Sequence, residues 1–310
     1  GLFLISTAIL LLVMQFSACQ NTRPRYNIGI SFHNMRDWHH AFRAEVEEEG
    51  RRNNALAVEF ASADGDTARQ RADIERFIED KVDLIVVMPG DSTSSREAIS
   101  RAMESGIHVV VFDHPIAGDD YTAYIGIDNH LLGRRLGGYI SSKLPDGGKV
   151  VEICGRKESP AANDRHSGLS ERIGEYDGVD LVASVNGDWT TESADRIADS
   201  LFRVVPDADA IFVHNSRMSR NIREIARRHG NDDMIVVSVD ALTEKGVRSV
   251  MDGVVDATMI YPTASREVIS TAVRIIDGRD FRRHTSLNAG VIVDSVSVST
   301  LIFNNPIEQL

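Results

Sequence analysis

Short runs of β-branched and aromatic residues alternate along this chain with longer stretches of helical spacing. Residues 109–112 read VVVF, an apolar run typical of a strand covered on both faces of a parallel sheet. Ile74, Phe77 and Ile78 stand at positions i, i+3 and i+4, the apolar stripe of a helix. In the first half, the pattern predicts strands at 26–32, 55–66, 83–92 and 109–112, and helices at 41–55, 67–82 and 92–106. Because strands and helices alternate, we expect a parallel sheet with right-handed crossovers.

The same alternation starts afresh after Asn129. It predicts strands at 149–155, 179–189, 208–215, 234–240 and 255–262, and helices at 131–148, 164–178, 192–206, 219–230 and 244–253. A further helix at 266–280 and a short strand at 289–294 follow, which a simple tandem of two domains would not need. If that helix packs on the first lobe, the chain crosses between the lobes three times and encloses a hinged cleft. Two independent tandem domains are the alternative.

The predicted fold class is α/β, with two doubly wound Rossmann-like lobes joined by a three-stranded hinge. We assign residues 1–25 to a leader and linker, 26–128 plus 262–290 to the N-terminal lobe, and 129–261 plus 291–310 to the C-terminal lobe. Ligands of open α/β sheets bind outside the carboxyl ends of the strands. Asp113 follows the run 109–112 directly and is therefore a candidate ligand contact, although an Asp at this place can also close a turn.

Composition excludes one class of partner. The chain has 310 residues and a formal net charge of -12, and its basic residues are scattered. A nucleic-acid binder needs a basic face to displace counterions, so we expect no nucleic-acid partner. Only Cys19 and Cys154 are present, so there is no disulfide framework.

The first eighteen residues are apolar and end in small residues before Cys19. This stretch resembles a bacterial lipoprotein signal, in which Cys19 would be the lipidated residue. An uncleaved membrane anchor is the competing interpretation, because the stretch approaches the length that spans a bilayer. Either one places the remainder outside the cytoplasm, in the periplasm or cell envelope, exported and membrane-anchored.

Several catalytic and metal chemistries lack their signatures. His33, His39 and His40 cluster with Asp37, but adjacent histidines point in different directions and no second cluster completes a shell, so we expect no metal. No glycine-rich phosphate loop follows the first strand and no G-x-S-x-G elbow is present, so we expect no cofactor and no catalytic residues. Cys154 ends a predicted buried strand and is interpreted as a small core residue.

A family resemblance covers nearly the whole chain from Tyr26 onward. It is carried by the segments IGIS, DLIVVMPGDS, IHVVVFDHP, YIGIDNHLLGRRLGGYI, SPAANDRHSG, AIFVHNSRM, VVSVDALTEKG and ATMIYP, in this order and spacing. They resemble the type I periplasmic sugar-binding proteins of the ribose-binding-like group. More narrowly, the segments YTAYIG-DN and IYPT are similar to periplasmic sensor domains of hybrid two-component systems that detect monosaccharides.

The resemblance implies a ligand site at matching positions. Asp113 stands where the family accepts hydrogen bonds from sugar hydroxyls, and His114 replaces the Arg that commonly follows. Arg165 matches a sugar-binding Arg, and Trp189 matches an aromatic wall of the pocket. Trp38 matches an aromatic in the first loop, with Asp37 and Asn34 beside it as weaker candidates.

Three further positions come from the second lobe and the hinge. Asn215 matches a pocket Asn, although Ser216 replaces the Asp usually beside it. Asp240 matches the second lobe's pocket Asp, and Tyr261 falls where a hinge Gln is common. Sugars present dense hydroxyls and apolar C–H faces, which carboxylates, guanidinium groups and aromatic rings suit. Both tryptophans fall at predicted loop positions, where a binding role is favoured.

The implied function is a non-enzymatic, extracytoplasmic module that closes on a monosaccharide, a pentose or hexose with fructose and ribose as candidates. The sensor domain of a two-component system is the leading interpretation. A substrate-binding lipoprotein of a sugar ABC transporter is the alternative, and a sugar-processing enzyme, which needs a carboxylate pair around the scissile bond, is the alternative from another class. The expected partners are a membrane-tethered signalling or transport protein and a second copy of the chain in a homodimer.

Overall fold

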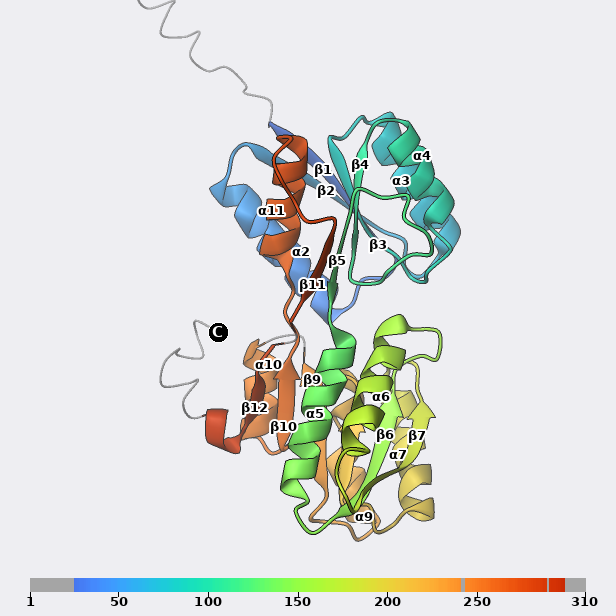
Figure 1. The fold of residues 1–310 in the computed structure, drawn as a ribbon, viewed down its shortest axis with the longest axis vertical. Coiled ribbons are helices and arrows are strands. Elements are labelled where there is room, and N and C mark those ends of the chain that lie inside the picture. Colours follow the sequence, from blue (N-terminus) through green and yellow to red (C-terminus); the bar gives the residue numbers. More distant parts are fainter. Residues whose placement is uncertain (1–24, 241–242, 289, 299–310) are drawn as a thin grey trace, which may run out of the picture.

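A computed structural model describes residues 25–240, 243–288 and 290–298. Two α/β lobes lie one beyond the other along the long axis of the molecule, with a narrow waist between them (Figure 1). The N-terminal lobe holds a six-stranded sheet in the order β11-β5-β4-β3-β1-β2. Its elements are β1 (Tyr26–Phe32), α2 (Asp37–Arg52), β2 (Leu56–Ser62), α3 (Thr67–Glu79), β3 (Leu84–Met88), α4 (Arg96–Glu104), β4 (His108–Phe112), β5 (Ala123–Ile127), α11 (Ser265–Ile276) and β11 (His284–Leu287).

The C-terminal lobe repeats this plan with a second six-stranded sheet, in the order β12-β10-β9-β8-β6-β7. Its elements are α5 (Asn129–Lys143), β6 (Gly148–Cys154), α6 (Pro160–Ile173), β7 (Val179–Asn186), α7 (Thr191–Val204), β8 (Ala210–Val213), α8 (Ser216–Ser219), α9 (Ile222–Arg228), β9 (Ile235–Asp240), α10 (Thr243–Met251), β10 (Ala257–Ile260) and β12 (Ile292–Asp294). The central strands β3 and β8 are buried along their whole length, as the apolar runs predict.

The chain passes between the two sheets three times, because β5 leads into α5, β10 leads back to α11 and β11 leads on to β12. These three segments lie together at the waist in Figure 1. The predicted fold class, two doubly wound lobes joined by a three-segment hinge, is confirmed.

Two details of the sheets differ from the sequence prediction. The strand β11 was not predicted, because its sequence HTSL is polar and its positions alternate between exposed and half-buried. It pairs parallel to β5 at the edge of the first sheet. The last strand, β12, pairs antiparallel to β10, so the second sheet is mixed rather than purely parallel.

The helix α5, which follows the first hinge segment, packs closely against α6. A Cβ atom added at Gly133 would lie 2.1 Å from the carbonyl oxygen of Arg165, and one added at Gly168 would lie 2.0 Å from that of His130. Only glycine allows two helix backbones to approach this closely. The first turns of α5 are therefore packed directly on the middle of α6.

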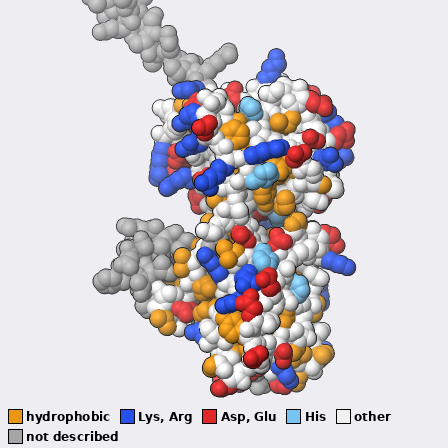
Figure 2. All heavy atoms as spheres, viewed as in Figure 1, with side chains coloured by type: hydrophobic (Ala, Val, Ile, Leu, Met, Phe, Trp, Pro, Cys, Tyr) orange, Lys and Arg blue, Asp and Glu red, His pale blue; other side chains and the backbone are white. Residues whose placement is uncertain are grey.

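Acidic and basic side chains are mixed over the face of both lobes that Figure 2 shows. Within the described part of the chain, no helix has the length and apolar character that a membrane crossing needs. The leader and the lipidation site at Cys19 lie outside the described residues.

Candidate ligand-binding site between the lobes

A cavity of about 210 Å³ opens between the lobes. Side chains from both lobes and from the hinge line it. Those predicted from the sequence are Asn34, Asp37, Trp38, Asp113, His114, Arg165, Trp189, Asn215 and Tyr261. Eight of the nine ligand-binding residues predicted from the sequence therefore line the same cavity, together with the weaker candidate Asn34. The ninth, Asp240, ends β9 opposite Ile260, and its side chain lies outside the described part of the structure.

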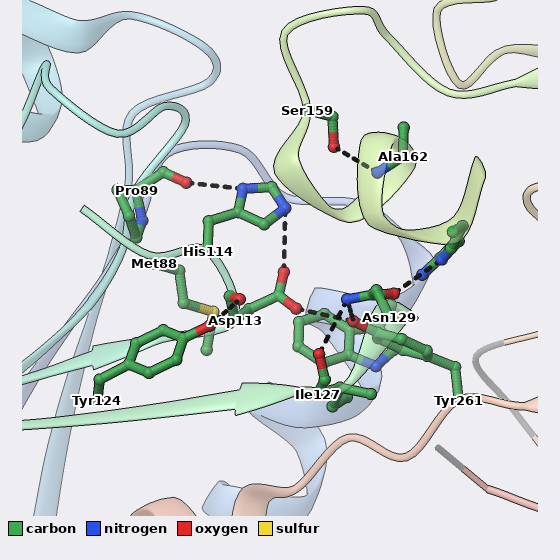
Figure 3. Close-up of polar contacts among 12 residues, drawn as sticks. Met88, Pro89, Asp113, His114, Tyr124, Ile127, Asn129, Ser159, Ala162 and Tyr261 are labelled. Atoms are coloured by element: carbon green, nitrogen blue, oxygen red, sulfur yellow. Dashed lines mark hydrogen bonds and ion pairs between the residues drawn. The ribbon is translucent and has the colours of Figure 1, made fainter. Parts of the chain in front are cut away.

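Asp113 is presented to the cavity by an unusual backbone conformation. It follows β4 directly and has a φ of 67°, which residues other than glycine seldom adopt. Two hydrogen bonds hold this conformation, from the Asp113 amide to Ile125 and from the Tyr124 hydroxyl to the Asp113 carbonyl. Figure 3 shows the carboxylate between His114 and Tyr261. His114 Nε2 lies 3.4 Å from one oxygen, and the Tyr261 hydroxyl donates to the other at 3.0 Å. The carboxylate is thus fixed with acceptor capacity left for a ligand.

Tyr261 joins the hinge to both walls of the cavity. It follows β10, and its ring is only 7% exposed. Its hydroxyl oxygen lies 3.4 Å from the Asn129 amide nitrogen, which also donates to the carbonyl of Ile127 (Figure 3). Burial and the nearby Asp113 carboxylate raise the pKa of the Tyr261 hydroxyl, so it stays a neutral donor. A single hydroxyl thereby connects the N-terminal lobe to two hinge segments.

Arg165 supplies a buried guanidinium group from the first half of α6. Its Nε donates to Asn129 Oδ1 at 2.8 Å, and its Nη1 donates to the carbonyl of His214 at 2.7 Å. The guanidinium carbon lies 4.9 Å from the ring centre of Tyr261 and 5.8 Å from that of Trp189, which are cation–π distances. Burial lowers the pKa of Arg165, yet arginine remains charged in proteins. The site therefore holds a desolvated positive charge, and among the described residues its hydrogen bonds go to neutral acceptors.

Trp189 lies in the loop before α7 with a φ of 72°. A Cβ atom at Gly155 would lie 1.9 Å from Cζ2 of its indole, so the ring packs directly on a glycine backbone. The centre of the His214 ring lies 6.1 Å from that of Trp189. Asp113 and Trp189 are two of the five described non-glycine residues with positive φ, and such strained positions concentrate at functional sites.

A buried carboxylate holds the His214 side chain next to Trp189. Glu152 on β6 is fully buried, and its oxygens lie 2.8 Å from His214 Nε2, 2.6 Å from His166 Nδ1 and 2.7 Å from the Ser184 hydroxyl. The Gly155 amide donates to His214 Nδ1, so the imidazole proton is on Nε2 and points to Glu152. Burial opposes ionisation of Glu152, but hydrogen bonds from His166 and His214 outweigh it and lower the carboxyl pKa to about 2.

Trp38 is placed differently from the prediction. It lies in the first turn of α2 rather than in a loop, so the loop assignment was wrong. Its ring packs near Phe42, Phe112 and Tyr261, with centroid distances of 6.2, 5.7 and 5.9 Å, and its indole N–H donates to the carbonyl of Pro262. Trp38 thus borders the cavity while it joins the apolar core to the hinge.

Two other predicted contacts carry structural hydrogen bonds as well. Asn215 precedes α8, and its side-chain oxygen accepts from the Met218 amide, so the oxygen caps that helix. Asp37 lies 3.3 Å from Arg217, an ion pair that joins α2 of one lobe to α8 of the other. This pair closes one side of the cavity.

The structure also brings in residues that the sequence did not single out. Asn129, His214 and Glu152 organise the wall around Arg165, while Arg36 and Arg156 line the opening. Asn129 is the first residue of α5, directly after the capping residue Asp128 that follows β5. No sequence signal marks Glu152, because a single carboxylate within an apolar strand does not reveal which residues pack against it.

One group of side chains in the described residues has the spacing of a metal site. Ligand atoms of Glu152, Cys154 and His214 lie within 4.8 Å of one another. Burial and the Glu152 carboxylate raise the pKa of the Cys154 thiol, and a protonated thiol is a poor metal ligand. The Glu152 oxygens already accept hydrogen bonds, so the donor set suits a hydrogen-bond network better than an ion. Cys154 is buried, as its interpretation as a core residue predicted.

The two lobes, with polar and aromatic side chains from both converging on one cavity, define a two-lobed binding protein with its site between the lobes. Residues 28–280 of the chain match the protein family described as the periplasmic binding protein domain. It belongs to this family, and the predicted resemblance is confirmed.

Individual relatives agree with this assignment. The chain is 24% identical over 228 residues to the ribose import binding protein of Escherichia coli K12, which covers 73% of this chain and 76% of that protein. It is 26% identical over 224 residues to the D-ribose/D-allose-binding protein of Pseudomonas aeruginosa, which covers 69% of each. Among solved structures, the fructose-binding periplasmic domain of a hybrid two-component system matches with a TM-score of 0.83 and 32% identity, over 90% of this chain and 94% of that one.

Proposed function

We propose that this chain is an extracytoplasmic receptor that closes its two lobes around a monosaccharide, without chemical turnover. The observation that carries the proposal is the convergence of Asp113, Arg165 and Trp189 on one cavity between the lobes. A carboxylate and a guanidinium group bind vicinal hydroxyls in pairs, and an indole face covers the apolar C–H face of a sugar ring. Asp113 comes from one lobe and the other two residues from its partner lobe.

Closure follows from this division of contacts. A sugar that touches Asp113 and Arg165 at once binds the closed arrangement better than the open one, so the ligand shifts the equilibrium toward closure by its difference in affinity. In the hinge, the Tyr261 hydroxyl donates to Asp113, and Asn129 bonds to that hydroxyl and accepts from Arg165. Tyr261 and Asn129 are placed to link occupancy of the cavity to the hinge angle.

The sensor role is favoured over the transport role by the similarity to the fructose-binding sensor domain, which is 32% identical. The ribose import binding protein of Escherichia coli is similar at 24% identity, so the substrate-binding lipoprotein of a transporter is the second candidate. A sensor would pass its lobe closure to a membrane-tethered kinase, with a homodimer as the expected assembly. A transport receptor would deliver the sugar to a permease.

Titration calorimetry against D-fructose, D-ribose, D-allose, L-arabinose and D-glucose tests the proposal. We expect saturable binding of at least one sugar, with the protein more compact by small-angle scattering when bound and the sugar recovered unchanged by NMR. Trp189→Ala should weaken affinity about tenfold or more, since it removes a stacking face, with little change in melting temperature. Failure of every sugar to bind to folded protein would refute a sugar receptor, and release of a modified sugar would indicate an enzyme.

A further inference from the structure

The opening of the cavity gathers positive charge in a chain that is acidic as a whole. Four arginines line the cavity, Arg36, Arg156, Arg165 and Arg217, against two aspartates, Asp37 and Asp113. The whole chain carries a formal charge of -12. This local excess of positive charge is opposite in sign to the protein around it.

The arginines come from both lobes. Arg36 precedes α2 in the N-terminal lobe, whereas Arg156 follows β6 and Arg217 lies in α8 of the C-terminal lobe. Closure of the lobes therefore brings like charges together. The pKa of Arg36 is lowered by burial and by the charges of Arg156 and Arg217, with Asp188 acting in the opposite direction. The three positive charges repel one another, and an anion among them would relieve this repulsion.

The protein supplies few acceptors to these groups. Arg217 pairs with Asp37, and Arg165 donates to neutral oxygens. Within the ranges that the structure describes, the backbone carbonyls of Arg36 and Arg156 accept from the amides of His40 and Ser159, but neither guanidinium group makes a hydrogen bond or ion pair. In addition, Arg36 provides no side-chain cap to α2, whose first turn lines the cavity. The positive end of that helix dipole adds to the same field.

We propose that the ligand is an anionic monosaccharide, a sugar phosphate or a sugar acid, whose charged group is held by Arg36 and Arg156. The sugar ring lies deeper, against Asp113, Arg165 and Trp189, and the acidic group lies at the opening. Guanidinium groups bind phosphate and carboxylate in a bidentate manner, which suits an acidic substituent better than a hydroxyl. This inference rests on the proposed function and narrows its ligand class.

Matched pairs of ligands test it by calorimetry at low salt: D-fructose with its 1- and 6-phosphates, D-ribose with its 5-phosphate, and D-glucose with D-glucuronate. At least one anionic sugar should bind about 10- to 100-fold more tightly than its neutral parent, because charge-assisted hydrogen bonds replace neutral ones. Comparison of the sugar phosphates with D-glucuronate shows whether the site prefers a phosphate or a carboxylate group. The preference should shrink as salt is added.

Arg36→Gln and Arg156→Gln should each reduce the preference for the anion while leaving neutral-sugar affinity nearly unchanged. Arg203→Gln, an exposed arginine on α7 that does not line the cavity, is the matched control and should change neither. Binding of neutral sugars as tight as that of their anionic partners would overturn this inference and leave the sugar receptor intact. Binding of inorganic phosphate as tight as that of any sugar phosphate would also overturn this inference alone, whereas no sugar binding at all would overturn both.

Discussion

In the C-terminal wall of the cavity, buried polar and charged side chains hold the binding groups in place. In the N-terminal wall, the strand before Asp113 is apolar, and the hydrogen-bond donor to Asp113 comes from the hinge. On the C-terminal side, Arg165 is 6% exposed and Glu152 and His214 are fully buried. On the N-terminal side, Asp113 follows the fully apolar end of β4, and its carboxylate is held by Tyr261 from the hinge and by the neighbouring His114.

The difference separates two ways to fix a polar binding group. In the C-terminal lobe the network of Glu152, His214 and Arg165 forms within one lobe, so it exists whether or not the lobes are closed. In the N-terminal lobe the main hydrogen bond to Asp113 comes from Tyr261, which lies between the lobes. We therefore expect changes in the C-terminal network to cost stability as well as affinity, and changes on the N-terminal side to act mainly on affinity.

The largest expected effect is that of Glu152→Ala. It leaves the buried His214 Nε2–H and the Ser184 hydroxyl without their acceptor, and each hydrogen bond lost to a charged acceptor costs about 1.5–3 kcal/mol. Urea unfolding should show this loss. Glu171→Ala is the matched control, since Glu171 is an exposed glutamate of the same lobe that pairs with Arg134 and His130, and its loss should cost about 1 kcal/mol or less. Equal losses from the two variants would mean that the buried network has no special role.

The second effect is a pH dependence of stability specific to Glu152. Its carboxyl pKa is about 2 in the folded protein against an ordinary 4.5, so it contributes stability above pH 4.5 that is lost as the pH falls toward 2. The full contribution is about 3 kcal/mol. Glu152→Gln does not titrate, so the difference in unfolding free energy between wild type and variant should be largest near neutral pH and should shrink by about this amount on acidification. A constant difference from pH 6 to pH 3 would contradict the assignment.

The sequence predicts those parts of the site that depend on strand ends. Asp113 follows a run whose length and composition mark where a strand stops, and the rule that ligands lie beyond such ends applies to it. Trp189 stood at the last position of the predicted strand 179–189, whereas β7 ends at Asn186 and leaves Trp189 in the loop that follows. Trp38 was misplaced because α2 begins without a capping side chain at Arg36, so nothing in the sequence marks its start.

The buried network could not be predicted for a different reason. Glu152 and His214 meet because β6 lies beside β8, which are not consecutive in the chain. Strand order in a sheet is decided by packing between distant segments, and local spacing carries no record of it. The strand β11 is a similar case, because its polar sequence forms a strand only where the edge of β5 is available.

The smallest and most specific effect is expected from Tyr261→Phe, which removes one hydroxyl and keeps the ring that packs near Trp38 and Arg165. Asp113 then loses its donor from the hinge, and ligand affinity should fall about five- to tenfold, as for one hydrogen bond of about 1 kcal/mol. Tyr139→Phe is the control, because the Tyr139 hydroxyl also donates to a carboxylate, that of Asp294, but does not line the cavity. Calorimetry should find a loss of affinity in the first variant alone, with comparable small losses of stability in both. If Tyr261→Phe instead lowers stability as much as Glu152→Ala and leaves affinity unchanged, the hinge hydroxyl is a structural brace, and the contrast between the two walls does not hold.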